Sequence, residues 1–456
     1  MSTTDTDEGL KRVVGVRGLA ATVVNFTIGA GIFALPGLIG IQLGPAGVIG
    51  YLLCGLMFAA IILCYVEVGS KIKSSGGSYA YVDAAFGPFA GFIINWLLFF
   101  GWGAIGSAAL MNVVADSLSV IYPPLLNPIA RTILFVVLIG TMIFVNMRGS
   151  KESVRVVGFI TIIKLIPLLG LIVLGLSHIQ ASNLKMEHLP SLKTFGDTSL
   201  ILFFAFAGFE TSLNVSGEIK DPKRTVPRGI LLGGITVFII YILLQTVTQG
   251  VLGGQLGEYK DAPLAAVAER IVGPVGLTIL LFAAVISGLG CVNGDVLSSP
   301  RLLFAGAKDG LFPKFLAKVH PKFTTPYIAV ITYAAMIFIF SISGSFKQLA
   351  ILASGALLLV YLAVILSLIK FRRKKVEDAE KTFKVPGGLV IPCIAIGAIL
   401  FVLSNLSREE MISISAFIAI VCMIYFVMKK FQGRKVLSES GLKDLKISRI
   451  SDNKDS

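Results

Sequence analysis

Ionisable side chains inside long apolar runs are the residues of this sequence that could do chemistry. Lys164 lies about 11 residues, or roughly 16 Å along a helix axis, from either end of its run, farther than a lysine side chain reaches toward water. Glu210 follows Gly208 by two residues, and Asp295 lies in a third run. Charges at membrane depth face the protein interior and mark binding or proton-carrying positions.

The composition shows which kind of protein surrounds these charges. Of the 456 residues, 55% are hydrophobic with glycine left out of the count, and 14% are charged. Soluble domains are about 45–50% apolar even with glycine included, and about 25% charged. The composition therefore argues against a soluble enzyme or a secreted receptor.

Apolar runs of about 20 residues recur along the whole chain, and each can cross a hydrocarbon core about 30 Å thick as a helix. We predict an all-α polytopic membrane protein without a soluble domain. Its twelve membrane-spanning helices are predicted at 17–42, 45–70, 87–118, 127–146, 153–176, 195–216, 227–252, 273–303, 326–344, 346–370, 389–405 and 411–431.

The distribution of basic residues predicts the orientation. With the N-terminus inside, the cytoplasmic segments carry 32 of the 40 Lys and Arg residues and the opposite loops carry seven. The positive-inside rule then places both termini, 1–16 and 432–456, in the cytoplasm of a multi-pass protein of the cell membrane. No cleavable signal peptide is expected at 1–16. The net charge of +14 reflects this topology rather than nucleic-acid binding.

Two predicted spans contain residues that are unfavourable in an uninterrupted helix. The first carries Gly29 and Gly31 near its middle, and the sixth carries Gly208 beside Glu210. Each of these spans is the first helix of a five-helix half. The halves are predicted at 17–176 and 195–370, and two further helices follow at 389–431. Glycine-interrupted helices at matching positions of two halves indicate an inverted-repeat transporter with a site at the membrane midplane. The alternative is that the glycines only allow close helix packing.

An amino acid zwitterion complements a pair of such breaks. Its carboxylate would meet the amides at the N-terminus of a second half-helix, where the helix dipole is positive. Its ammonium would meet carbonyls released at the end of a first half-helix. Irregular backbone at this depth is tolerated only where it lines a cavity and finds partners.

Several motifs occur in an order that resembles the amino acid, polyamine and organocation superfamily. They lie at 29–33, 76–82, 208–228, 297–326 and 383–387, and the resemblance extends from about residue 15 to 430. It implies twelve helices, a LeuT-type inverted repeat of five plus five helices with helices 1 and 6 broken, two further helices, alternating access and amino acid substrates.

The resemblance also implies a substrate site. Its residues are Thr27, Gly29, Ala30, Gly31, Ile32, Phe204, Ala207 and Gly208. The substrate carboxylate would lie against the amides of residues 30–32 and its ammonium against the carbonyls of Thr27, Phe204 and Ala207. Phe204 would be the aromatic gate. Some members carry serine where this chain has Ala30, so a hydroxyl contact to the carboxylate is missing.

Lys164 matches a lysine that, in the superfamily, reaches toward the first broken helix and occupies the position of a sodium ion in sodium-coupled relatives. Our hypothesis is sodium-independent transport, in which the charge or protonation of Lys164 links the first break to opening and closing. The alternative is a fixed cation that satisfies carbonyls of the first span in every state.

The other candidates each have two interpretations. Glu210 either caps the second break or is a pH-sensing or substrate-facing carboxylate, with equal weight. Asp295 stands where many superfamily members carry small or apolar residues. It lines the cytoplasmic path and favours cationic substrates, or it pairs with Arg301, which we favour. Trp102 is expected to face lipid or the core, and is a weak pocket candidate.

We therefore predict a secondary active amino acid transporter, not an enzyme or a channel, with sodium-independent and proton-coupled uptake. Lys164 and Glu210 are the predicted coupling residues. Aliphatic and aromatic residues of spans 3 and 6 favour neutral substrates; exchange, and cationic amino acids or polyamines, are the alternatives. The expected partners are an amino acid, protons and the lipid bilayer. No catalytic residue, metal or cofactor is expected, and the sequence leaves the particular amino acid and the oligomeric state open.

Overall fold

The computed structural model describes residues 14–71, 77–148, 153–186, 189–308, 313–323, 325–373, 383–385 and 387–451. Parts of the sequence motifs, namely Gly76, Asp309, Gly310 and Pro386, lie outside these ranges, as do residues 1–13 of the predicted N-terminal segment.

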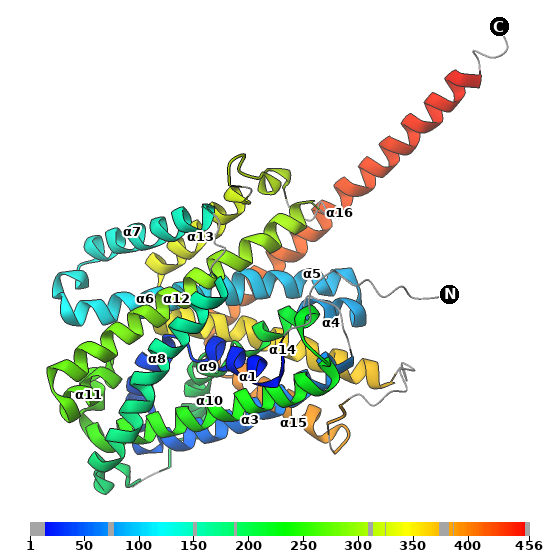
Figure 1. The fold of residues 1–456 in the computed structure, drawn as a ribbon. Coiled ribbons are helices and arrows are strands. Elements are labelled where there is room, and N and C mark those ends of the chain that lie inside the picture. Colours follow the sequence, from blue (N-terminus) through cyan, green and yellow to red (C-terminus); the bar gives the residue numbers. More distant parts are fainter. Residues whose placement is uncertain are drawn as a thin grey trace.

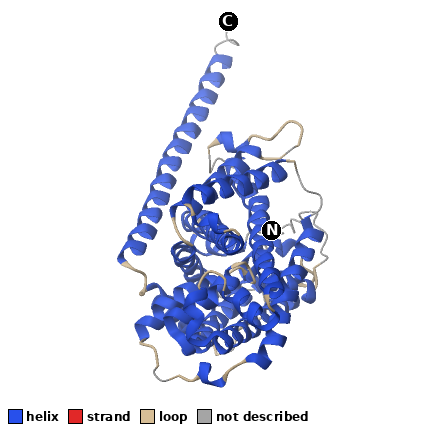
Figure 2. Cartoon of the chain, turned by 90° about the vertical axis from the view of Figure 1, so that its left-hand side faces the viewer, coloured by secondary structure: helices blue, strands red, loops and turns tan. Residues whose placement is uncertain are grey.

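The regular structure of the described residues is helical, with one isolated bridge between Val14 and Ile219 (Figure 2). The α-helices are α1 Val16–Thr27, α2 Gly31–Leu43, α3 Gly47–Lys71, α4 Gly77–Phe86, α5 Pro88–Trp96, α6 Ile105–Ile121, α7 Pro128–Met147, α8 Ser153–Gly175, α9 Leu192–Phe206, α10 Pro222–Leu252, α11 Pro263–Val272, α12 Pro274–Lys308, α13 Tyr327–Ser343, α14 Phe346–Arg373, α15 Val390–Leu403 and α16 Arg408–Ser451. A π-helix, η2 (Leu97–Ala104), joins α5 to α6, and a 3₁₀ helix, η6 (Phe209–Glu218), follows α9.

The helices confirm a polytopic, all-helical architecture. Eight helical runs are long and apolar enough to cross a membrane, and three shorter apolar helices are present at Ile162–His178, Tyr327–Ser343 and Val390–Leu403. Every predicted span falls on one helix or on two or three consecutive helical segments, although α16 continues well beyond the predicted end at 431. Twelve crossings and the five-plus-five repeat stay predictions.

Burial separates central helices from peripheral ones. In the apolar part of α14, 72% of the residues are buried, against 17% in α7 and 6% in the Arg408–Lys429 part of α16. Figure 1 accordingly shows α7 at the edge of the bundle and α16 extending beyond it. Exposed Ile129, Ile133 and Phe144 give α7 an apolar outer face, as lipid contact requires.

Two carboxylates outside the breaks are held by arginines. Glu67 on α3, 1% exposed, accepts from Arg372 Nε at 2.9 Å and from the Val385 amide at 2.8 Å. Asp116 on α6 accepts from Arg131 Nη1 at 2.6 Å. The Glu67–Arg372 pair joins parts of the chain that are 305 residues apart, and pairing makes a buried charge such as Glu67 tolerable.

The two interrupted spans are also joined to each other. The Lys220 amide donates to the Val14 carbonyl at 2.9 Å, which links the residues just before α1 to those just after η6. On its other side α1 packs closely on α10, where a Cβ added at Gly233 would lie 2.7 Å from Val23 Cβ. The segments α1, η6 and the first part of α10 therefore form one packed group.

Candidate functional site

The first break lies between α1 and α2, where the chain leaves the α-helical path for Ile28, Gly29 and Ala30. The Gly29 amide donates to the Thr27 carbonyl at 2.9 Å. At the start of α2, the Ala30, Gly31 and Ile32 amides belong to the first turn, whose N–H groups have no acceptor within the helix. They form the positive end of α2, which suits a carboxylate.

The second break follows α9. Gly208 has φ +115°, and a Cβ added there would lie 2.6 Å from the Phe26 carbonyl oxygen. The Gly208 amide donates to Glu210 Oε2 at 3.0 Å, so it does not continue α9. Glycine is thus required by the backbone conformation and by the approach of α1. The two breaks meet at this point.

A tyrosine that the sequence analysis did not select bridges both breaks. The Tyr241 hydroxyl, on α10, lies 2.9 Å from the Thr27 carbonyl and 3.0 Å from the Ala205 carbonyl. The single hydroxyl hydrogen is shared between these two carbonyls, and the Gly29 amide also donates to the Thr27 carbonyl. The Thr27 carbonyl, which we predicted to bind the substrate ammonium, therefore already has partners in the protein. The Thr27 hydroxyl is buried and has no hydrogen-bond partner in the structure.

Lys164 reaches the first break, as the resemblance implied. It is fully buried on α8, and its Nζ donates to the Asn25 carbonyl at 2.7 Å. Asn25 lies in the last turn of α1, where carbonyls lack helical partners and the dipole favours a cation. Lys164 is not among the residues that line the cavity, so its contact with the site passes through α1.

Glu210 caps the second break and also faces the cavity. Its Oε2 accepts from the Gly208 amide and from the Tyr361 hydroxyl of α14 at 2.9 Å. Its Oε1 is buried and has no partner in the structure. The capping interpretation is therefore correct in geometry, and the unpaired oxygen leaves a proton-carrying role compatible with it.

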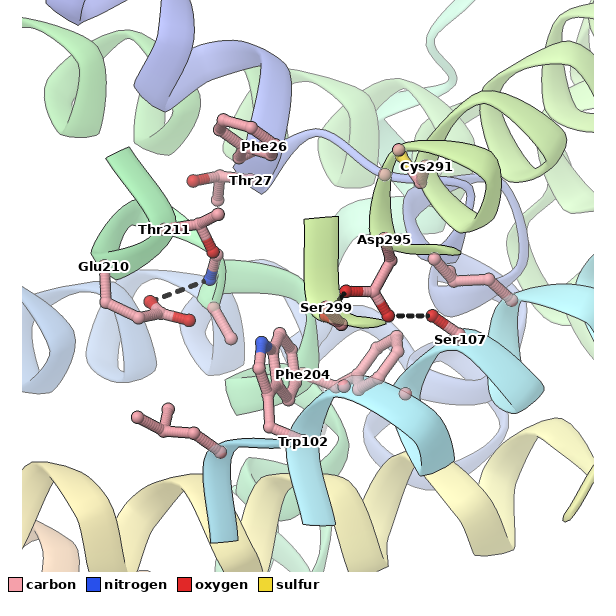
Figure 3. A pocket seen from close by; sticks show the side chains of 18 of the residues that line it. Phe26, Thr27, Trp102, Ser107, Phe204, Glu210, Thr211, Cys291, Asp295 and Ser299 are labelled. Carbon is pink, nitrogen blue, oxygen red and sulfur yellow. Dashed lines mark hydrogen bonds between the residues drawn. The ribbon is translucent and has the colours of Figure 1, made fainter. Parts of the chain in front are cut away.

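A cavity of about 540 Å³ lies at the meeting point of the breaks (Figure 3). Of the predicted substrate residues it is lined by Thr27, Gly29, Gly31, Ile32, Phe204, Ala207 and Gly208. Ala30 is the exception, since its side chain is fully buried and lies 3.2 Å from where a Cβ would stand at Gly288 of α12. Ser78 and Tyr79 of α4 also line the cavity, on the side that the basic residues predict to be cytoplasmic.

Aromatic rings form one wall. A Cβ at Gly31 would lie 3.2 Å from the Phe204 ring, so this ring lies directly over the start of α2. The Trp102 ring lies 5.5 Å from the Phe204 ring and also lines the cavity, which corrects the expectation that Trp102 faces lipid or the core. Trp102 stands in the π-helix η2, an irregularity that often occurs at functional sites.

Asp295 lines the cavity and does not pair with Arg301, so the favoured interpretation was wrong. Asp295 and Arg301 are six residues apart on α12, and side chains at this spacing point to different faces of an α-helix. Side chains three or four residues apart would share a face. Arg301 is accordingly exposed. The Asp295 carboxylate instead accepts from Ser107 Oγ at 2.8 Å, from Ser299 Oγ at 2.6 Å and from the Tyr333 hydroxyl.

The described residues that line the cavity include two carboxylates, Glu210 and Asp295, and no Lys, Arg or His. The positive end of α2 can hold an anionic group, and carbonyls, hydroxyls and carboxylates can hold a cationic one. Chemically, the site suits a small zwitterion rather than an anion. No reacting pair of nucleophile and base lines it.

Comparisons with known proteins cover nearly the whole chain. A family model described as "Amino acid permease" matches residues 14–429. The chain is 28% identical over 441 residues to the serine/threonine exchanger SteT of Bacillus subtilis, covering 93% of this chain and 98% of that protein. It is 26% identical over 445 residues to the branched-chain amino acid permease BcaP of the same organism (94% and 96% covered). It is 27% identical over 408 residues to the b(0,+)-type amino acid transporter 1 of Mus musculus (86% and 82% covered).

Replacing Gly208 by alanine is expected to abolish the arrangement of the breaks. The added Cβ would meet the Phe26 carbonyl at 2.6 Å, and the left-handed backbone alone costs about 1–2 kcal/mol for a residue with a side chain. We expect a lower melting temperature of the detergent-purified protein and loss of substrate binding. The matched control is Gly140→Ala on α7, where nothing lies within 4 Å of an added Cβ. Equal behaviour of the two variants would contradict the assigned role.

Proposed function

This chain belongs to the amino acid permease family, and from that premise we propose that it takes up amino acids by sodium-independent, proton-coupled transport with alternating access. The family is one of membrane transporters, and the three relatives described above are amino acid transporters by name. The observation that carries the proposal is the meeting of two helix breaks at one cavity.

The proposed substrate position follows from the backbone and side-chain groups at the breaks that can still form hydrogen bonds. The carboxylate binds the amides of Ala30, Gly31 and Ile32 at the start of α2. The ammonium binds near the Phe204 and Ala207 carbonyls and the unpaired Thr27 hydroxyl, since Tyr241 already occupies the Thr27 carbonyl. Phe204 closes over the substrate beside Gly31.

The proposed movement uses the halves 17–176 and 195–370 as a LeuT-type inverted repeat, with 389–431 outside it and both termini cytoplasmic. The contacts between α1, η6 and α10 support it, because they let the inner halves of both broken spans move together. The cavity already reaches α4, on the predicted cytoplasmic side.

Sodium independence is supported by Lys164. Its ammonium lies 2.7 Å from a carbonyl at the end of α1, and a fixed positive charge there repels a second cation. Proton coupling is supported by the location of Lys164 and Glu210, one at each break, because each can change its charge where α1 or η6 begins to move.

Exchange of one amino acid for another is the second candidate, because a relative that matches 93% of the chain is named an exchanger. The neutral preference predicted from the aliphatic and aromatic residues of spans 3 and 6 stays a prediction, and the Asp295 carboxylate in the cavity wall favours the cationic alternative.

Uptake into proteoliposomes tests the mode of transport. With labelled neutral, cationic and acidic amino acids, replacing sodium by choline is expected to leave uptake unchanged. An inward proton gradient is expected to give accumulation in empty vesicles, which collapses with a protonophore. Uptake confined to vesicles preloaded with amino acid would establish exchange instead, and a strict sodium requirement would refute the role given to Lys164.

Two substitutions of Lys164 test its role in coupling. Lys164→Gln removes the charge and is expected to lower uptake at least about tenfold, the value of a hydrogen bond to a charged group, and to remove its pH dependence. Lys164→Arg keeps a charge that cannot be released and should also fail if proton release matters. The control is Lys193→Gln, an exposed lysine outside the cavity. Normal pH-dependent uptake by Lys164→Arg would leave the fixed-cation alternative.

Glu210→Gln tests whether the second break carries a proton. A glutamine oxygen can still accept from the Gly208 amide and the Tyr361 hydroxyl, so the cap is kept while the ionisable group is lost. We expect a flattened pH profile of uptake with an unchanged melting temperature. If uptake keeps its normal pH profile, Glu210 only caps. Glu258→Gln, at an exposed position, is the matched control.

A further inference from the structure

Asp295 differs in its partners from Glu67, Asp116 and Glu210. Glu67 and Asp116 are each paired with an arginine, and Glu210 caps a helix break. Asp295 is bound by three hydroxyl groups, those of Ser107, Ser299 and Tyr333. Hydroxyl donors stabilise a carboxylate without cancelling its charge, so a negative group remains in the cavity wall.

The carboxylate also retains room for one more donor. Two carboxylate oxygens offer about four acceptor positions. Ser107 and Tyr333 donate to Oδ2, and Ser299 donates to Oδ1, so the position left is on Oδ1. The described residues that line the cavity include no Lys, Arg or His that could fill it. Asp295 is half-buried, so its charge is only partly screened by water, and a bound cation would complete this site.

The cluster is built into the packing of three helices. Tyr333 is fully buried, and Ser107 is 6% exposed. A Cβ at Gly103, in the π-helix η2, would lie 2.6 Å from the Tyr333 hydroxyl oxygen and 3.6 Å from Asp295 Oδ2. Glycine at this position therefore makes room for the hydroxyl, and the carboxylate is held ready in one orientation.

The distance from the helix break fits a long side chain. Gly29, at the first break, faces Cys291 of α12, whose Sγ would lie 3.9 Å from a Cβ at Gly29. Asp295 is one helical turn farther along α12, about 6 Å along the axis. An extended lysine side chain spans on the order of 6 Å from Cα to its nitrogen. In Figure 3, Asp295 lies across the view from Glu210 and Thr211, with Trp102 and Phe204 labelled between them.

From this geometry we infer that the transporter takes basic amino acids, whose side-chain ammonium or guanidinium binds Asp295 while the amino acid head binds the helix breaks. The inference rests on the proposed amino acid transport and names its substrate class. The methylene groups pass the Trp102 and Phe204 rings, which suit an aliphatic stem.

The test compares lysine with norleucine, which has the same chain without the side-chain nitrogen. In proteoliposomes we expect kcat/KM for lysine to exceed that for norleucine by at least about tenfold. Asp295→Asn should reduce this ratio to near one by slowing lysine uptake alone. Diaminopropionate, whose side chain is too short to reach Asp295, should be a poor substrate. Glu258→Gln is the matched control and should keep the wild-type ratio.

Asp295→Glu serves as the second variant if Asp295→Asn does not fold. It keeps the charge but moves it one methylene into the cavity, so the preferred diamino acid should shift from lysine toward ornithine. An unshifted preference would overturn the inference, as would equal loss of lysine and norleucine uptake in Asp295→Asn. A wild-type protein that carries only neutral amino acids would refute the substrate class and leave amino acid transport intact. Failure to move any amino acid would refute the proposed function itself.

Discussion

A backbone amide or carbonyl released at membrane depth must find its partner inside the protein, because lipid supplies none. The two helix breaks release such groups at one point, where Gly208 lies against the Phe26 carbonyl. Three side chains satisfy them. The Tyr241 hydroxyl lies within hydrogen-bond distance of two carbonyls, Lys164 donates to a third carbonyl, and Glu210 accepts a hydrogen bond from the Gly208 amide. The positive end of α2 stays available, so the requirement that stabilises the breaks also creates the binding site that we propose.

The same constraint explains how charge is distributed. Arginines hold the carboxylates outside the breaks, and a helix end holds the buried lysine. The cavity wall is different, because it keeps two carboxylates without a basic residue among those that line it. A bound zwitterion brings its own anionic group to α2 and its cationic group to the rest of the wall. In the proposed function, the substrate ammonium therefore supplies a positive group that the described lining residues lack.

Local sequence patterns predicted the parts of this arrangement that depend on local chemistry. Apolar length predicted the helices, glycine content predicted both breaks, and the depth of Lys164 predicted that it faces inward. Contacts between distant residues were beyond such patterns. Tyr241 and Tyr333 are single hydroxyls in apolar helices, and their partners lie far away in the chain. The close packing at Gly101 and Gly103 of the π-helix η2 likewise involves residues far away in the chain, Ala356 and Tyr333.

The contacts of α1 show where a small free energy could control a large movement. On one side α1 is packed against α10 and joined to η6, through Gly233 and through the bridge at Val14. On the α8 side, the hydrogen bond from Lys164 to Asn25 holds the end of α1. A hydrogen bond to a charged group contributes about 1.5–3 kcal/mol, and couplings between sites are of similar size, about 1–3 kcal/mol. In the proposed mechanism, a change in the charge on Lys164 would therefore alter the free energy that holds the end of α1 by an amount comparable to the free energy that couples two sites.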